Sequence, residues 1–231
     1  MVFCKLRFFK RPGNTFLICA IGLFAFLHSA QAQSSPATVT FTCDFPGSDP
    51  SHYVVSVSAD GHSSYVSDGK LNSDSSPGDP SRLEFTVSPA TTTRVFDLTK
   101  RAHYFEGEID LKKKNIASTG VKTLTYKDGQ KSTQATYNYS PVSAVQELTT
   151  LFQSLSTTLE FGRRLDYYFQ YQKLALDEEL KRMEDRFNSG GLEEVSAVAP
   201  VLQKIADDPS VIKVVRARAQ RLLQLAVAGS K

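Results

Sequence analysis

At Ser140-Pro141 the hydrophobic pattern of this chain becomes helical and remains so, and no other feature constrains the fold as strongly. From residue 38 to about residue 139, most apolar residues alternate with polar ones, which is the period of half-buried strands. After Pro141, apolar residues recur at spacings of three and four, which is the period of amphipathic helices. Because the strands precede the helices, the sequence predicts an α+β fold with a sheet domain at 38–140 and a helical subdomain at 141–231.

Two turns place hairpins in the sheet domain. Asp60-Gly61 and Asp128-Gly129 each separate two alternating runs, and both positions of such a turn favour positive φ. A spacing of three and four over residues 90–104 predicts one helix, and the polar, Gly/Pro/Ser-rich residues 68–80 predict an exposed loop. With the other alternating runs, we expect an antiparallel sheet of about six strands with one packed helix. These other runs lie at 39–45, 82–87 and 105–111.

The helical subdomain should hold three to four helices. A first apolar stripe ends at Leu159, and a second runs from Leu165 to Phe187, so Gly162 either separates two helices or weakens one continuous helix. A third helix is expected at 192–206, kinked or split by Pro200. A fourth should begin at Asp208-Pro209, with Asp as the cap and Pro in the first helical position.

The first 32 residues have the pattern of a secretory signal peptide. A basic start precedes a short apolar core at 15–27, and the segment ends in Ala30-Gln31-Ala32. We expect cleavage between Ala32 and Gln33, a flexible leader at 33–37, and a periplasmic or secreted product. The alternative is an uncleaved membrane anchor, although 13 apolar-core residues are fewer than the roughly 20 that span a bilayer.

Cleavage would leave Cys43 as the only cysteine, which excludes an internal disulfide. Its place in an alternating run favours a small buried residue, and an intermolecular disulfide or a catalytic thiol are the alternatives.

Charge argues against nucleic acid as a partner. The chain has 27 cationic and 24 anionic residues, but four of the cations lie in the first 32 residues. Beyond residue 32, the 23 remaining cations face 24 anions, so the net charge is −1. A chain of this balance has no overall attraction for a polyanion.

Motifs for catalysis or metal binding are absent from the sequence. It contains no HExxH, GxSxG or GxGxxG, and its three histidines beyond residue 32 are not spaced as paired ligands. Acidic residues and an asparagine gather at 68–79, but their spacing does not match a calcium loop. We therefore predict no catalytic, cofactor-binding or metal-binding residues, and leave an enzymatic role open.

Partner contacts are expected on the helical subdomain. Arg216, Arg218 and Arg221 make the last helix basic, and Tyr167 and Tyr168 belong to an aromatic cluster too dense for one buried stripe. The three arginines are candidate contacts for an acidic partner or, more weakly, for anionic lipid headgroups, and the two tyrosines are candidate contacts for a partner protein. A solvated cationic helix and aromatic packing within the chain are the alternatives.

Two segments resemble known families. Residues 52–155, with both Asp-Gly hairpins, Tyr65 and the helix from Val95 to Phe105, resemble an uncharacterised bacterial secreted domain of unknown function. Residues 193–229, with Pro200 and the Asp208-Pro209 turn, are similar to a single HEAT-type helical repeat. The first resemblance implies a fold without an activity, and the second implies a docking surface.

Together these features favour a secreted or periplasmic, non-enzymatic interaction or scaffold module. Its helical subdomain would contact another envelope protein. The alternatives are a hydrolase-type enzyme with its site between the sheet and the helices, and a protein that binds a small ligand or inhibits another protein.

Overall fold

The computed structural model describes residues 35–72, 80–112, 117–129 and 131–229. The predicted signal peptide, its cleavage point and residues 73–79 of the predicted loop lie outside these ranges. The residues from Ser34 to Lys231 cluster into one compact unit, which includes both the sheet and the helical subdomain.

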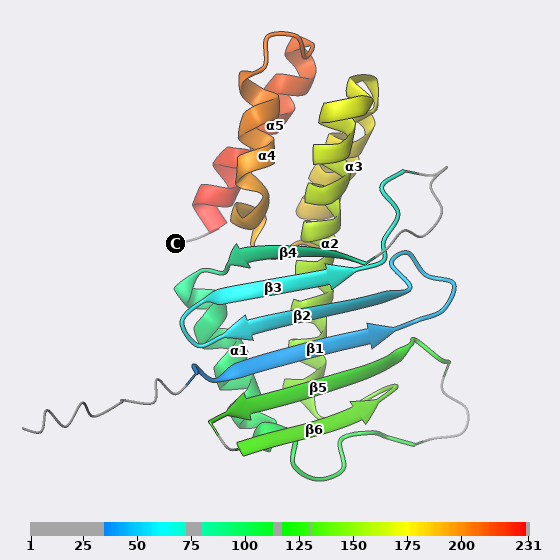
Figure 1. Cartoon of the computed structure of the whole chain (residues 1–231), viewed down its shortest axis with the longest axis vertical. Helices are drawn as coiled ribbons and strands as arrows, with labels where there is room; N and C mark the ends of the chain where they lie inside the picture. The colour runs from blue at the N-terminus through cyan, green and yellow to red at the C-terminus, as the bar shows by residue number, and fades with distance from the viewer. Residues whose placement is uncertain (1–34, 73–79, 113–116, 130, 230–231) are drawn as a thin grey trace, which may run out of the picture. The chain divides into compact units, whose positions relative to one another are not determined.

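Six antiparallel strands form one sheet in the order β4-β3-β2-β1-β5-β6 (Figure 1). This arrangement confirms the predicted fold class, α+β with an antiparallel sheet of about six strands. Alternate residues of β1 are fully or nearly buried, as the period of two requires. The strands are β1 Thr38–Asp44, β2 His52–Ser58, β3 His62–Ser67, β4 Ser81–Thr86, β5 Val121–Asp128 and β6 Lys131–Tyr137.

Two helices cover one face of the sheet: α1 (Pro89–Arg101) and the first half of α2 (Ser143–Tyr171). In Figure 1 both lie behind the strands. The ring of Phe152 in α2 stacks on that of Phe41 in β1, with centroids 5.4 Å apart. Leu148 and Leu155 of α2 are also completely buried in this layer. The core of the sheet domain is therefore completed by a helix that continues into the helical subdomain.

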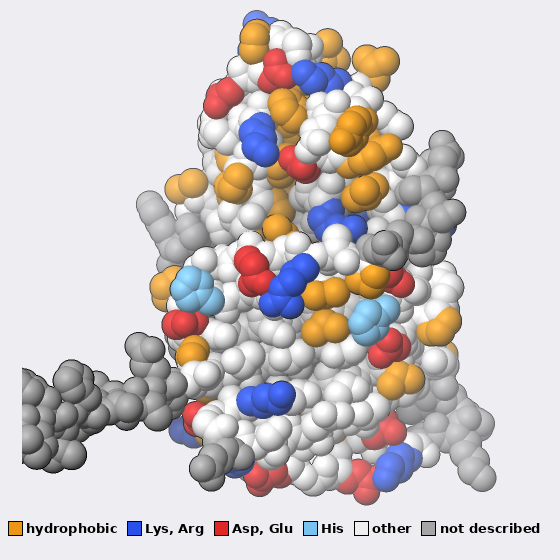
Figure 2. Space-filling view, in the orientation of Figure 1, with side chains coloured by type: hydrophobic (Ala, Val, Ile, Leu, Met, Phe, Trp, Pro, Cys, Tyr) orange, Lys and Arg blue, Asp and Glu red, His pale blue; other side chains and the backbone are white. Residues whose placement is uncertain are grey.

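The other face of the sheet, called here the open face, carries mainly hydroxyl side chains. Figure 2 shows this face, on which neither hydrophobic nor charged side chains predominate. The hydroxyls bond across strands, for example Thr40 to Ser56 at 2.9 Å and Thr123 to Thr136 at 3.0 Å.

A left-handed turn follows α1, at residues where the sequence predicts the end of a helix and the start of a strand. His103, Tyr104 and Phe105 have φ values of 51°, 54° and 63°, a conformation that costs each residue about 1–2 kcal/mol. The turn buries the Phe105 ring to 1% exposure, and the Thr133 hydroxyl donates to the Tyr104 carbonyl at 2.6 Å. The strand expected at 105–111 is therefore wrong, because these tertiary contacts outweigh the local pattern.

Helix α2 runs without a break through Gly162, so two helices do carry the two apolar stripes, but this glycine does not separate them. The break falls later, at Gln172 (φ −145°) and the 3-10 turn η2 (Lys173–Ala175), before α3 (Leu176–Asn188).

The last helices begin later than their sequence signals indicate. Pro200 lies in the first turn of α4 (Ala199–Asp207), after the 3-10 turn η3 (Val195–Val198). The helix expected to begin at Asp208-Pro209 starts instead at Lys213, as α5 (Lys213–Gly229). The Asp208 carboxylate is the reason, because it accepts bonds from the Ser210 amide at 2.8 Å and from Lys173 Nζ at 2.6 Å. It closes a local turn instead of capping a helix, and these bonds lower the pKa of Asp208 to about 2.

Candidate functional site

A groove of about 540 Å³ lies between the edge strand β4, the C-terminal part of α2 and the start of α4. We call it the β4 groove. It joins residues far apart in the sequence, since β4 ends at residue 86 and α4 begins at residue 199. Its lining is mostly apolar and comprises Leu71, Ser81, Leu83, Glu84, Gly162, Arg163, Asp166, Tyr167, Gln170, Tyr171, Ala197, Val198, Pro200, Val201 and Lys204.

Gly162 sets the distance between the two helical walls of the groove. A Cβ atom at this position would lie 2.4 Å from Cγ1 of Val198, far closer than carbon atoms pack. Glycine therefore allows η3 to approach the α2 backbone, and α4 then starts directly beside the groove. This contact is the reason that glycine fits here inside a long helix, where it is otherwise unfavourable.

Two tyrosines one helical turn apart form the α2 side of the groove. The rings of Tyr167 and Tyr171 lie 5.2 Å apart, and Asn72 Nδ2 donates to the Tyr167 hydroxyl at 2.9 Å. Tyr171 is 70% exposed, a large fraction for an aromatic ring on a groove wall. The pair offers a wide apolar surface with a polar tip, the kind of side chain that is enriched in protein interfaces.

A buried charged network fixes α2 to the sheet beneath the groove. Arg163 NH1 donates to both carboxylate oxygens of Glu160, at 2.8 and 2.9 Å, and the Tyr65 hydroxyl donates to the same carboxylate at 2.8 Å. Ser156 lies 2.9 Å from the Tyr65 hydroxyl. Burial, followed by the nearby Glu160 charge, raises the pKa of Tyr65. Every member has a partner, so the network locks geometry and leaves no free acid or base.

A second network continues from α2 to α3. Glu179 of α3 is completely buried and accepts from Arg164 Nε at 2.6 Å and from Arg182. The Arg164 guanidinium also lies 3.9 Å from the Glu160 carboxylate, so the two networks are continuous. The two networks therefore hold the part of α2 that carries Tyr167, one by bonds to the sheet and the other by bonds to α3.

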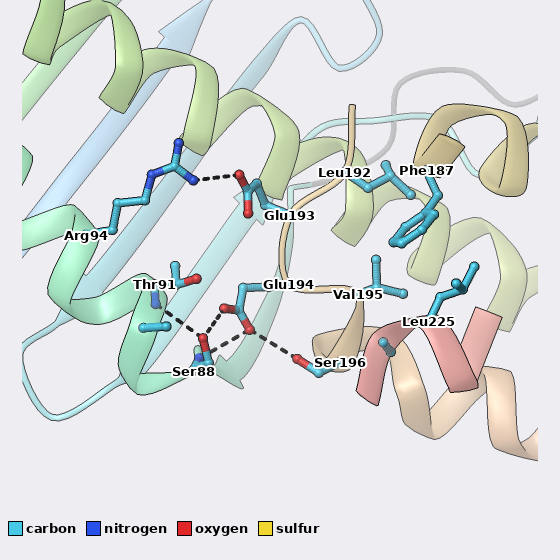
Figure 3. Close-up of a pocket in the computed structure, with 12 residues that line it drawn as sticks. Ser88, Thr91, Arg94, Phe187, Leu192, Glu193, Glu194, Val195, Ser196 and Leu225 are labelled. Carbon is cyan, nitrogen blue, oxygen red and sulfur yellow. Dashed lines mark hydrogen bonds and ion pairs between the residues drawn. The ribbon is translucent and has the colours of Figure 1, made fainter. Parts of the chain in front are cut away.

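A smaller cavity, of about 280 Å³, lies where α1 and η3 meet (Figure 3). Glu194 adopts the left-handed conformation, with φ 52°, and accepts from the Ser88 amide at 3.2 Å and the Ser88 hydroxyl at 2.5 Å. Its carboxylate therefore lies at the N-terminus of α1, where a negative charge is favoured. Beside it, Arg94 donates to Glu193 at 2.9 Å. These bonds join the helical subdomain to the sheet domain.

The five predicted contact residues lie on different surfaces. Tyr167 lines the β4 groove, whereas its neighbour Tyr168 is buried and borders another cavity, with Arg164 and Arg182. On α5, Arg218 bonds Asp177 and Glu184 of α3, and Arg221 bonds Glu184 at 3.0 Å. The Nε atom of Arg216 is buried without a hydrogen-bond partner. Arg218 and Arg221 therefore hold α5 against α3.

Leu83 and Tyr171 were not among the five predicted contact residues, although both line the groove. The signal for Leu83 was present, because it is an inward residue of the last strand before a helix. The signal for Tyr171 was weaker, since only the density of the aromatic cluster indicated rings on more than one helical face.

One end of the sheet holds a buried lysine that the sequence analysis also missed. Lys122 occupies the inward register of β5, opposite Cys43, and donates to three backbone carbonyls within 3.1 Å. Burial lowers the pKa of Lys122 and raises that of the Cys43 thiol. Cys43 is buried, as the alternating pattern predicted, and it forms no disulfide with another described residue.

No family model matches the chain, and no curated protein matches it. These results are consistent with an uncharacterised domain of unknown function. Within the described ranges, no three His, Cys, Asp or Glu side chains gather as a metal site would require. None of the helices there is both long and apolar enough to cross a lipid bilayer.

Proposed function

We propose that this protein is a non-enzymatic interaction module, secreted or periplasmic, that holds a partner protein in the β4 groove. One observation carries the proposal: a mostly apolar groove whose lining includes Tyr171, a ring that is 70% exposed. Exposed apolar surface with a polar rim is typical of contact sites between proteins.

The polar groups around the groove support binding over catalysis. Lys204 and Asp166 lie 3.4 Å apart at the rim, and Gln170 also donates to Asp166 at 2.6 Å. Arg163 is occupied by Glu160. Because these charged and amide groups bond one another, they stabilise the rim and can orient a bound partner.

The groove replaces the last helix as the docking surface we favour on the helical subdomain. Arg218 and Arg221 are engaged with α3, whereas Tyr167 faces the groove. The partner is therefore expected on the β4 side of the helices.

Photo-cross-linking tests the proposal. We would place p-benzoylphenylalanine at Tyr171 in the full chain, identify the cross-linked partner, and measure its affinity for purified protein. Tyr171→Ala should weaken binding about tenfold, since an aromatic anchor contributes more than about 1 kcal/mol. Leu174→Ala is the matched control, because Leu174 is 93% exposed and lies outside the groove lining. Equal effects of the two variants would refute the proposed site.

Export is tested separately. N-terminal sequencing of the protein recovered from the envelope and from the medium should begin at Gln33. A chain that keeps Met1 and fractionates with membranes would instead support the anchored alternative.

A further inference from the structure

β4 is an edge strand, and the alternation of backbone bonds shows which of its groups point away from the sheet. Val87 N donates to Gly61 O at 3.1 Å, so the backbone N–H and C=O groups of residue 87 point toward β3. In an antiparallel pair only every second residue exchanges bonds with the neighbouring strand. The backbone groups of Phe85 and Leu83, which lie opposite Ser63 and Tyr65, therefore also point toward β3. The backbone N–H and C=O groups of residues 82, 84 and 86 point out of the sheet.

The outer edge of β4 is open toward the groove. Among the described residues, β3 is the only strand paired with β4. Ser81, Leu83 and Glu84 of β4 line the groove, opposite the tyrosines of α2 and the start of α4. Unpaired backbone groups beside an apolar hollow match the requirements of an added strand, whose backbone would bond β4 while alternate side chains enter the hollow.

We infer that the β4 groove takes an extended peptide segment of the partner, which pairs antiparallel with β4 as a seventh strand. This inference rests on the proposed function and specifies how the partner binds.

The two faces of β4 define the chemistry of that segment. Leu83 lies on the helical side, so the segment's residues on this side should be apolar. Arg82 and Glu84 lie on the open face, both well exposed and bonded to each other at 2.6 Å. Opposite charges favour each other across strands. The segment should therefore place Lys or Arg opposite Glu84, and Asp or Glu opposite Arg82, with apolar residues between and beside them.

The groove walls favour a single segment over a second copy of this chain. Two sheets joined antiparallel through β4 would carry their helices on the same face. The space beyond β4 on that face already holds residues of α2 and α4, such as Tyr167 and Val201, which line the groove. The α1 and α2 layer of a second copy would occupy the same space, whereas a peptide without a helical layer avoids this overlap.

The test uses a fluorescein-labelled peptide, Ser-Val-Lys-Val-Glu-Val, and the full chain. Saturable binding should slow hydrogen exchange of the Glu84 amide at least about tenfold. The control amide is that of Gln134 in β6, the other edge strand. The pair Asp128–Lys131 that closes this hairpin is hydrogen bonded, and bonded and non-bonded pairs alternate along the two strands from there. Gln134, opposite Thr125, belongs to a non-bonded pair, so its amide also points outward. Its exchange should not change. A peptide with Lys and Glu exchanged should bind several-fold more weakly.

Two proline variants test the backbone contact. Glu84→Pro removes one outward donor together with the carboxylate that faces the segment's Lys or Arg, and it should weaken peptide binding at least about tenfold, while Gln134→Pro should leave it unchanged. Circular dichroism verifies that each variant is folded, and the exchange experiment on the unsubstituted chain does not depend on either variant.

The possible outcomes distinguish a failure of the strand-pairing inference from a failure of the proposed function. Absence of saturable binding, unchanged exchange at Glu84, or a dimer that the peptide does not dissociate would overturn the inference. If Glu84→Pro keeps the partner that cross-links at Tyr171, the groove remains the docking site but strand pairing is wrong. If the Tyr171 cross-link yields no partner, the proposed function itself fails.

Discussion

The contact between Gly162 and Val198 leads to a quantitative prediction for Gly162→Ala. The new methyl group would lie 2.4 Å from Val198 Cγ1, and overpacking of this kind costs about 1–3 kcal/mol. Replacing a helical glycine by alanine otherwise gains about 1 kcal/mol. The variant should therefore be less stable than the parent by up to about 2 kcal/mol.

The matched partner is Val198→Ala, which deletes the methyl groups that obstruct the new side chain. Alone it should cost about 1.5–3 kcal/mol, from the lost burial and the cavity. In the double variant the methyl group introduced at position 162 fills part of that cavity, so the two changes should couple favourably by at least about 1 kcal/mol.

Urea unfolding of the four proteins, followed by far-ultraviolet circular dichroism, gives the required free energies. Tyrosine fluorescence is an independent probe, because the chain has nine tyrosines and no tryptophan. If Gly162→Ala stabilises the protein by the full helix-propensity gain, or if the two changes are additive, the proposed close approach of η3 and α2 is refuted.

Three further predictions concern the charged groups and the thiol. Glu179→Ala should destabilise the protein by about 3 kcal/mol in urea unfolding, because Arg164 and Arg182 lose a buried partner; a loss below about 1 kcal/mol would contradict this. Hydrogen bonding from Arg221 lowers the pKa of Glu184, so its stabilisation is present above the ordinary glutamate pKa and lost as the pH falls through the lowered value. Melting temperatures should show a smaller acid-induced decrease for Glu184→Gln, and identical profiles would argue against the pair. Cys43 should react with iodoacetamide far more slowly in the native protein than in urea, given its burial and raised pKa, and fast native labelling would show that the site opens.

The sheet could be predicted from the sequence because its signals are local. Asp60-Gly61 and Asp128-Gly129 define hairpins within a few residues, and alternation assigns Val39, Phe41 and Cys43 to one face. The left-handed turn at 103–105 could not be predicted, because the contacts that hold it come from the core and from Thr133, 29 residues after Tyr104. A short alternating run gives no information about such distant partners.

The groove was harder to predict than the fold for the same reason. Tyr167 was identified from its aromatic cluster, but Leu83 is 84 residues earlier in the chain and becomes its neighbour only after α2 has packed on the sheet. The basic side of α5 was visible in the sequence, but nothing in the sequence paired it with Asp177 and Glu184 of α3. Sequence periodicity shows which face of a helix is polar, but it does not show which other helix that face meets.

The uninterrupted α2 also restricts how relatives of this chain could differ in length. Each residue of an α-helix advances the chain by about 100° and 1.5 Å. A single insertion near Gly162 would therefore turn Tyr167 and Tyr171 by more than a quarter of a circle relative to Phe152, which is fixed on the sheet. Homologues that keep the groove should have no insertions or deletions between these positions, and should vary in length within the 68–80 and 112–120 connections instead.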